Sequence, residues 1–513
     1  MIATIIDNKI KCFDCYQIKE RLKSLGFTWN KEENSWETSY STHIENAIKN
    51  LGLNVVKREN PPKELVQELK QRHTEAFDHQ IEAAALAIKE KSFLIGDEPG
   101  VGKTFTALIY AEYLLAKNIT DVVFILCPAS IKRQWQQEVN RWLGETAYVV
   151  NGDKKKREKI FWSIKNTKNI KIVILNYELL LAKDVYEFLN SFKSFTLVID
   201  EASRVKNQKS KTFKALYSLA KKTDHKIAMT GTPLENSLQE FWAIGYILKG
   251  SSFMSWEEFE SKHVYYTEIK PKHLNFSIKK ISGYRNLKSF IARISPFYIR
   301  RKKADLKQMP ILTEYTLEIE QSSLQEKLER YILEMAFEGV RNEMEALTKL
   351  SLLRVIADDP RLLLQSDSSY ALSVAKKFDE EIRQIKKNQK IEEVKEIIKE
   401  HGDKKVIILT QFKKMAEMLF KEFQDAILIT GDDSNDKKAT KVGMFKNKDY
   451  KILIGTDALT YGISIDEADV LINFDIPWSI GKIIQRRDRI YRISSTRPKW
   501  VYYLVSEGTE KKV

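Results

Sequence analysis

The chain has 513 residues, a length that corresponds to about three or four domains. Its 85 lysines and arginines exceed its 70 aspartates and glutamates, which gives a net charge of +15. This charge favours a polyanionic partner; the alternative is a protein that is rich in lysine but binds no polyanion. No apolar run reaches the roughly 18 residues that a membrane span needs, and the N-terminus lacks the layout of a secretory signal. We therefore expect no membrane partner.

The three cysteines do not suggest a disulfide framework, which favours a reducing compartment. Cys12 and Cys15 form a lone CxxC motif, and only Cys127 remains far along the chain. Because zinc usually takes four ligands, a metal site at this motif is not expected.

Residues 1–58 are expected to form a small α+β module, which Asn60-Pro61-Pro62 would link to the rest. Trp29 and Trp36 flank a polar turn. They belong either to the core of the module or to a surface that stacks on nucleic-acid bases. The other expected elements are a strand over 1–11 and helices over 16–25 and 44–51.

Two blocks of short apolar strands follow, each strand separated from the next by a helix-like stretch. Strands rich in Val and Ile without alternation are typical of parallel sheets buried on both faces, so each block predicts a doubly wound α/β lobe, over 61–245 and 401–513. The first block holds 92–95, 122–127, 171–175, 196–199 and 226–229; the second holds 405–409, 426–429, 451–454, 470–474 and 500–504.

Residues 246–400 are too long for a plain connection, so we expect them to fold as a mainly helical insertion. Apolar residues recur at helical spacing over 324–342 and 376–399. Residues 263–284 instead predict a hairpin, which either splits nucleic-acid strands as a wedge or is simply buried.

The most informative motif is GDEPGVGKT at residues 96–104, between an apolar strand and a helix-like segment. A strand, a glycine-containing turn and a helix start form a cradle for phosphates. Lys103 would reach the β and γ phosphates and the Thr104 hydroxyl would bind Mg²⁺. Asp97 stands where the usual pattern has its first glycine.

A second motif, LVIDEA at residues 197–202, ends an apolar strand with two carboxylates. Asp200 would hold Mg²⁺ through water, and Glu201 would polarise the attacking water. Thr230 and Thr232 follow the last strand of this lobe, where hydroxyls can sense the state of the phosphates. Together with Lys103, these residues predict ATP hydrolysis.

The second lobe carries QRRDRIYR at residues 485–492. Arg489 and Arg492 are three residues apart, which would place both on one face of a helix. Two such arginines can act as fingers on a γ-phosphate and raise the rate by on the order of 10³-fold or more. A solvated basic helix is the alternative.

These motifs, in this order, resemble the SNF2 (Swi2/Snf2-like) family of superfamily 2 helicases and DNA translocases, from about Pro61 to Val505. Asp97–Thr104 is similar to the DEMGLGKT phosphate loop of that family, so Asp97 fits its pattern. Ser203, Ser464, Ser479 and Ser494-Ser495 depart from it. The resemblance also rests on 77–80, 127–130 with Trp135, 176–178, 204–207, 296–303, 456–468 and 475–478.

The resemblance implies two RecA-like lobes that use ATP and Mg²⁺, with Thr104 and Asp200 holding the metal. Gln485 would join Lys103, Asp200, Glu201 and the two arginines in catalysis. Thr230, Thr232, Pro128, Thr456 and Trp478 would couple hydrolysis to DNA. The nucleotide would be held by Gln80, Pro99, Gly100, Val101, Gly102, Lys103, Thr104, Phe105, Gly462 and Asp466.

The module at 1–58 is loosely similar to the HARP-type module of annealing and fork-remodelling SNF2 proteins. Our first hypothesis is therefore a monomeric, ATP-driven translocase or helicase that acts on branched DNA, as phage branch-migration helicases do. It would work in the cytoplasm of a bacterium or phage-infected cell, or in the nucleus of a eukaryote. The alternatives are a non-catalytic DNA-binding or loading factor that ATP switches, and an RNA helicase.

Overall fold

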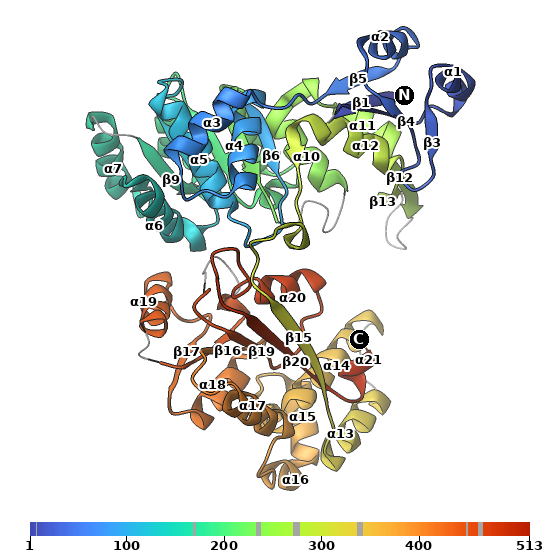
Figure 1. Cartoon of the computed structure of the whole chain (residues 1–513). Coiled ribbons are helices and arrows are strands. Elements are labelled where there is room, and N and C mark those ends of the chain that lie inside the picture. Colours follow the sequence, from blue (N-terminus) through green and yellow to red (C-terminus); the bar gives the residue numbers. More distant parts are fainter. Residues whose placement is uncertain are drawn as a thin grey trace. The chain divides into compact units, whose positions relative to one another are not determined.

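The computed structural model describes residues 1–6, 8–167, 171–231, 238–269, 278–335, 342–447, 450–459 and 465–512 (Figure 1). The chain divides into two compact units, Met1–Asp305 and Leu306–Val513. Each unit contains a parallel sheet with helices, so the expected α/β class with two doubly wound lobes is confirmed. Within the described ranges, no helix has both the length and the apolar character that crossing a bilayer requires.

The N-terminal module is a five-stranded sheet, and the single strand expected over 1–11 is wrong. That segment forms a hairpin of β1 (Ile2–Ile6) and β2 (Lys9–Phe13), and Asn8 adopts the left-handed conformation (φ 63°) that asparagine tolerates in a turn. The sheet order is β3-β4-β2-β1-β5. Its other elements are β3 (Thr28–Asn30), β4 (Ser35–Ser39), β5 (Asn54–Lys57), α1 (Lys19–Ser24) and α2 (Thr42–Asn50).

The module packs on the rest of the first unit through a small apolar contact. Ile2 and Phe13 form a buried cluster with Ala292 of α12 (Leu287–Ile294). Lys288 of the same helix donates a hydrogen bond to the carbonyl oxygen of Glu32 (2.6 Å). The module is thus part of the first compact unit.

The large sheet of the first unit has the order β14-β6-β11-β10-β7-β9-β8, and all of its strand pairs are parallel. The five predicted strands are all present, and β8 and β14 were not expected. The strands are β6 (Ser92–Ile95), β7 (Val123–Cys127), β8 (Tyr148–Val149), β9 (Ile172–Asn176), β10 (Thr196–Ile199), β11 (Lys226–Met229) and β14 (Tyr298–Ile299).

Helices pack on this sheet because its strands are apolar on both faces (Figure 1). The most extensive contacts come from α4 (Asp78–Glu90), α5 (Lys103–Ala116), α6 (Lys132–Leu143) and α10 (Leu238–Lys249). The other helices of this part of the unit are α3 (Lys63–Arg72), α7 (Lys154–Asn166), α8 (Lys183–Leu189), α9 (Lys211–Ala220) and α11 (Trp256–His263). Because all of these strands run in one direction, their carboxyl ends meet at one edge, where the predicted phosphate loop begins.

The predicted hairpin is present as β12 (Val264–Ile269) paired antiparallel with β13 (Ile278–Tyr284). Its connection, residues 270–277, lies outside the described residues. The wedge role stays a prediction.

The second unit has a six-stranded parallel sheet with the order β15-β20-β19-β16-β18-β17. Along β16, Val406 and Ile408 join one core cluster while Ile407 and Leu409 join another, so both faces of the sheet are buried. The strands are β15 (Leu312–Ile319), β16 (Val406–Thr410), β17 (Ala426–Ile429), β18 (Ile452–Thr456), β19 (Val470–Asn473) and β20 (Lys499–Ser506).

β15 was not expected, since it lies in the segment that the sequence predicts to be mainly helical. The continuous helix expected over 376–399 is also interrupted, because the buried Asn388 caps a new helix by accepting from the N–H of Ile391. The helices are α13 (Ser323–Glu334), α14 (Asn342–Asp358), α15 (Ser369–Lys377), α16 (Asp379–Arg383), α17 (Gln389–Glu400), α18 (Lys413–Glu422), α19 (Asn435–Lys446), α20 (Ile480–Arg487) and α21 (Thr509–Lys512).

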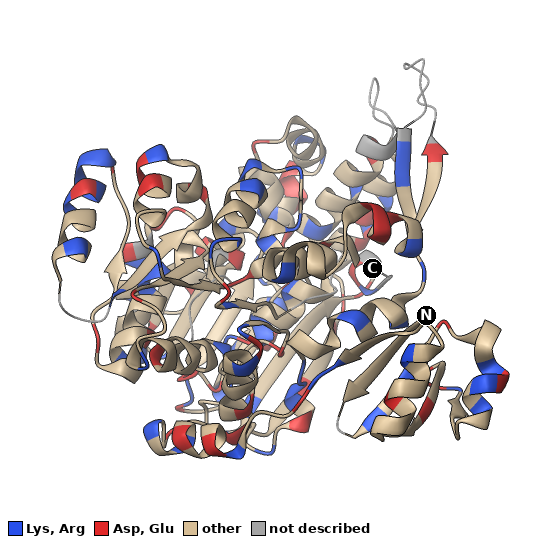
Figure 2. Cartoon of the chain, turned by 90° about the horizontal axis from the view of Figure 1, so that it is seen from above, with Lys and Arg blue, Asp and Glu red and all other residues tan. Residues whose placement is uncertain are grey.

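The surplus of positive charge is spread over the surface. Figure 2 shows lysines and arginines on many helices, several of which also carry acidic residues. The net charge alone therefore does not locate a nucleic-acid interface.

Candidate nucleotide site and nucleic-acid interface

The phosphate loop connects β6 to α5 at the carboxyl edge of the first sheet. Gly100 (φ 85°) and Gly102 (φ 90°) adopt conformations that residues with a Cβ rarely reach. Lys103 is the first residue of α5, and its ammonium donates to the carbonyl oxygens of Asp97 (2.6 Å) and Glu98 (3.0 Å). A lysine and a helix N-terminus thus converge on one turn, as binding of phosphates requires.

Two acidic side chains of this loop hold the residues that follow β14. The buried Asp97 accepts from the backbone N–H (2.8 Å) and the guanidinium (3.2 Å) of Arg301. Glu98 accepts from the backbone N–H of Lys303 (2.9 Å). Burial raises the pKa of Asp97, although the charges of Arg301 and Lys103 oppose the rise. We call Asp97, Glu98, Arg301 and Lys303 the acidic latch.

The latch accounts for Asp97, and close packing on β14 accounts for the glycine before it. A Cβ on Gly96 would lie 2.5 Å from the ring of Tyr298 in β14, so only glycine fits there. The sequence signalled the latch by the unusual Asp97, but the partner is 204 positions away. The role of Arg301 was therefore missed.

Two residues at the start of α4 brace the same loop. The Gln80 side-chain amide donates to the carbonyl oxygen of Gly102 (3.3 Å), and its own oxygen accepts from the N–H of Phe77 (3.0 Å). Nε2 of His79 lies 3.0 Å from the carbonyl oxygen of Val101, so this nitrogen carries the donated proton. The structure thus brings Gln80 to the loop, and its adenine contact stays a prediction.

The two carboxylates after β10 lie at the same edge of the sheet. Asp200 accepts from the indole N–H of Trp135 (2.8 Å) and from the N–H of Glu201 (2.9 Å). Burial and the charge of Glu201 raise the pKa of Asp200 to about 7, although Trp135 and Lys103 act in the opposite direction. Glu201 is exposed and has a positive φ of 50°, a strained conformation typical of functional positions.

Other predicted residues of the first unit lie around this loop with different exposure. Thr230 is buried after β11, and a Cβ on the next residue, Gly231, would lie 2.7 Å from the Pro99 side chain. The Phe105 side chain is buried and stacks on Trp142, so it is not available to a ligand. Pro128 follows β7 directly and begins a 3-10 turn. Thr232 and Gly462 lie outside the described residues, and the backbone of Thr104 belongs to the first turn of α5.

In the second unit, the prediction that Arg489 and Arg492 share a helical face is wrong. Helix α20 ends at Arg487, and the carbonyl oxygen of Arg489 accepts from the N–H of Ile465 rather than from a further helical turn (3.2 Å). Gln485 lies within α20, and the guanidinium Nε of Arg489 donates to its carbonyl oxygen (3.3 Å).

Arg492 and Asp466 belong to the same neighbourhood. Ser494 donates to Asp466 (2.7 Å). Although burial opposes the change, this bond and the charges of Lys446 and Arg492 lower the pKa of Asp466. The structure therefore brings together two residues that the sequence assigned to the nucleotide separately.

Arg486 organises this edge of the second sheet, a role that the sequence did not reveal. It is fully buried and donates to Asp457 (2.9 Å) and to Asp475 (3.2 Å). Although burial opposes the change, Arg486 and Thr410 lower the pKa of Asp475. Asp457 follows Thr456 directly, so this network fixes the strand ends from which the predicted DNA contacts begin.

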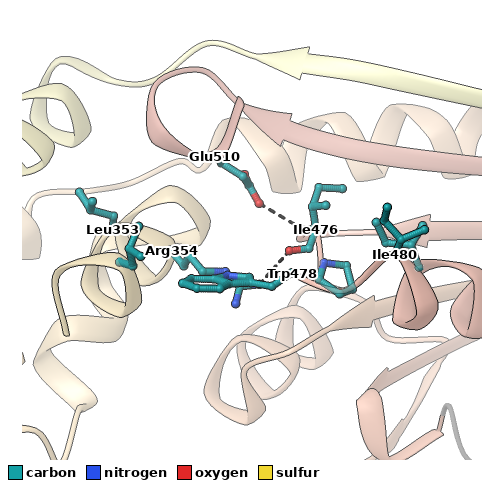
Figure 3. Close-up of a pocket in the computed structure, with 9 residues that line it drawn as sticks. Leu353, Arg354, Ile476, Trp478, Ile480 and Glu510 are labelled. Atoms are coloured by element: carbon teal, nitrogen blue, oxygen red, sulfur yellow. Dashed lines mark hydrogen bonds between the residues drawn. The ribbon is translucent and has the colours of Figure 1, made fainter. Parts of the chain in front are cut away.

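Trp478 lies beside a small apolar pocket of about 140 Å³ in the second unit (Figure 3). The guanidinium of Arg354 lies 5.2 Å from the centre of its ring and donates to the carbonyl oxygen of Ile476 (2.8 Å). Glu510 accepts from the N–H of Ile476 (3.3 Å). The backbone before Trp478 is thus held rigidly while its ring stays half-exposed.

The two tryptophans of the N-terminal module have different environments. Trp36 is 8% exposed and belongs to the module core, whereas Trp29 is 48% exposed and lies against it at 5.4 Å between ring centres. The core interpretation is confirmed for Trp36. The stacking of Trp29 on a base stays a prediction.

Comparison with known proteins agrees with this architecture. The profile of the SNF2-related domain matches residues 23–362, and that of the helicase conserved C-terminal domain matches residues 389–494. Since the first match covers more than half of the chain, the chain belongs to the SNF2-related family.

Two curated relatives and one solved structure illustrate the similarity. Human chromodomain-helicase-DNA-binding protein 1 is 27% identical in an alignment 442 positions long, which covers 82% of this chain and 25% of that protein. The ATP-dependent DNA helicase DDM1 of Arabidopsis thaliana is 27% identical in an alignment 448 positions long, which covers 82% of this chain and 57% of that protein. The chain thus spans between a quarter and somewhat more than half of the length of these relatives. A Sulfolobus solfataricus SWI2/SNF2 ATPase core solved with dsDNA is 26% identical, with a TM-score of 0.40, over 85% of this chain and 88% of that one.

Proposed function

We propose that the protein is an ATP-driven DNA translocase or helicase. The observation that carries the proposal is the convergence of Lys103, the start of α5 and Asp200 at one edge of the first sheet. An ammonium and backbone N–H groups suit a triphosphate, and carboxylate and hydroxyl oxygens suit Mg²⁺. The donor set therefore fits ATP with Mg²⁺.

In this proposal Lys103 binds the phosphates, and Thr104 and Asp200 hold the metal, partly through water. Bound Mg²⁺ supplies neutralisation of phosphate charge. Glu201 orients the attacking water and accepts its proton. The ionised form of Asp200 is needed for this role, and a nearby dication favours that form because it attracts the carboxylate.

DNA is the proposed track because the chain belongs to the SNF2-related family and its relatives carry the names of DNA helicases. Trp478, Thr456 and Pro128 are the proposed coupling residues. Branched DNA is the preferred substrate we propose, since the half-exposed Trp29 gives the N-terminal module an aromatic surface for an unpaired base.

The test is ATPase activity measured with single-stranded, duplex, forked and four-way DNA, and with RNA. We expect the largest stimulation by forked or four-way DNA. Lys103→Ala and Glu201→Gln should abolish turnover, whereas Lys154→Ala, at an exposed lysine of α7, should not. Normal turnover in the Lys103→Ala variant would contradict the assignment of the ATP site. Stronger stimulation by RNA than by DNA would mean that RNA, not DNA, is the substrate.

Variants of Arg489 and Arg492 distinguish an ATP-driven motor from a protein in which ATP binding only changes the conformation. If they act on the transition state, Arg489→Ala and Arg492→Ala should keep ATP affinity while the turnover number falls by on the order of 10³-fold. A wild-type chain that binds ATP but never completes more than one turnover would instead support the non-catalytic loading factor.

A further inference from the structure

A polar cavity lies in the first unit, at the edge of the sheet opposite the phosphate loop. It is lined by the amino ends of β6 and β11 and by the ends of α4, α9 and α10, and has a volume of about 420 Å³. Its charged lining residues are Glu90, Lys91, Lys221, Asp224, Lys226 and Lys249. Because the strands are parallel, their amino ends are a full strand length from the predicted ATP site.

Lys226 is the central feature of this cavity. Lys226 is only 7% exposed, and its ammonium donates a hydrogen bond to the carbonyl oxygen of Ala220 (3.1 Å). An ammonium has three donors, and the described residues place no carboxylate in an ion pair with this one. Burying a cation outside an ion pair is costly. Burial lowers the pKa of Lys226 to about 8, although the charge of Asp224 opposes this effect.

Lys249 repeats this arrangement at the end of α10. Its ammonium donates to the carbonyl oxygen of Glu90 (3.2 Å) and lies 5.3 Å from the centre of the Phe297 ring. Burial lowers the pKa of Lys249 as well, although the charges of Glu90 and Asp224 oppose this effect.

The two acidic lining residues do not cancel this charge. Burial raises the pKa of Glu90, although the charges of Lys249 and Lys89 oppose the rise, and Asp224 is exposed at the rim. Lys91 and Lys221 add two exposed ammonium groups at the same cavity. Four lysines therefore face two carboxylates in a concave, partly desolvated site.

We propose that this cavity binds a phosphate-class anion, either inorganic phosphate or the phosphate group of a small monoester. Several acceptor oxygens on one compact anion match ammonium donors that come from different elements. The anion would add negative charge where four lysines line the cavity with only two carboxylates. The inference does not depend on the proposed motor function, because none of its residues belongs to the ATP site.

The test is calorimetric titration of inorganic phosphate into the full chain carrying Lys103→Ala, which removes the lysine of the phosphate loop. We expect saturable binding that Lys226→Met or Lys249→Gln weakens by about tenfold or more, since one charged hydrogen bond is lost. Lys222→Met is the matched control, because Lys222 is the exposed neighbour of Lys221 and does not line the cavity. Thermal unfolding without phosphate checks that each variant folds.

Two further measurements make the outcome decisive. Sulfate, whose charge is constant, should bind more weakly as the pH rises from about 7 to about 9, because the Lys226 ammonium loses its proton. A short DNA duplex should leave phosphate binding unchanged; competition would mean that the site takes a DNA-backbone phosphate, which overturns the small-anion assignment. Equal binding by the Lys226, Lys249 and Lys222 variants would overturn the site itself.

Discussion

Replacing Asp97 by asparagine should destabilise the first unit, because the guanidinium of Arg301 then loses the buried one of its two acidic partners. Asparagine retains one carbonyl oxygen, which can still accept from the N–H of Arg301. Its amide NH₂ would then face the guanidinium, donor against donor, where the carboxylate accepts at 3.2 Å. Arg301 keeps only its ion pair with the half-exposed Glu82 (2.9 Å).

The magnitude follows from the bonds that are lost. A hydrogen bond between charged groups contributes about 1.5–3 kcal/mol, and an unpaired buried charge costs about 3–5 kcal/mol. Because one bond and the Glu82 pair survive, we expect Asp97→Asn to lower the free energy of unfolding by about 2 kcal/mol. Arg301→Gln should cost about 3 kcal/mol, since it leaves the deeply buried Asp97 carboxylate with one backbone N–H.

The assay is a double-mutant cycle. Urea unfolding is monitored by pulsed hydrogen exchange in peptides that contain β6, because these peptides report on the first unit alone. The Asp97→Asn/Arg301→Gln double variant should lose about 1–2 kcal/mol less than the sum of the single variants, because neither partner is left charged and alone. Additivity within about 0.5 kcal/mol would refute the latch as an interacting pair.

Three more predictions follow from the same unit. Gly231→Ala should lower ATP turnover by about tenfold, since its Cβ would lie 2.7 Å from the proline of the phosphate loop and misplace it, while Gly443→Ala, which meets nothing within 4 Å, should not. Trp36→Ala should lower the free energy of unfolding by about 3–5 kcal/mol, whereas Trp29→Ala should cost less than about 1 kcal/mol and instead weaken fork binding by about tenfold in a fluorescence titration. Burial lowers the pKa of His79 from 6.5, so below about pH 6.5 the unfolded chain binds more protons than the folded chain, and the free energy of unfolding should fall. His79→Gln should remove this part of the pH dependence of urea unfolding. A variant with unchanged pH dependence would contradict the assignment.

The strands and the phosphate loop could be predicted because their causes are local. Fully buried parallel strands need unbroken Val, Ile and Leu, so β6, β7 and β10 stand out in the sequence. The loop likewise needs glycine at Gly100 and Gly102, where φ is positive. All ten predicted core strands are present in the two sheets.

The elements that were missed depend on partners far along the chain. β14 consists of two residues, and β15 carries exposed polar side chains at a sheet edge, so neither has the apolar signature of a central strand. The end of α20 before Arg489 depends on a bond to Ile465, and the break before α17 depends on the buried Asn388. Periodicity alone continues a helix through such points, because it contains no information on tertiary hydrogen bonds.

A gain in folding free energy does not explain why the acidic latch consists of charged residues. The pKa of Asp97 is raised even though Arg301 is its partner, which means that desolvation of the carboxylate outweighs the attraction. A buried pair of this kind is often replaceable by neutral residues at little cost in folding free energy. Its charged form instead fixes the start of the phosphate loop to Arg301 and Lys303, which lie at the end of the first unit, just before the chain enters the second. The double variant of the cycle therefore separates the two roles. If the latch serves orientation, this variant should recover about 1–2 kcal/mol of the summed loss in stability while ATP turnover stays low. A neutral amide pair removes the uncompensated charge but lacks the two hydrogen bonds with which the carboxylate holds the loop.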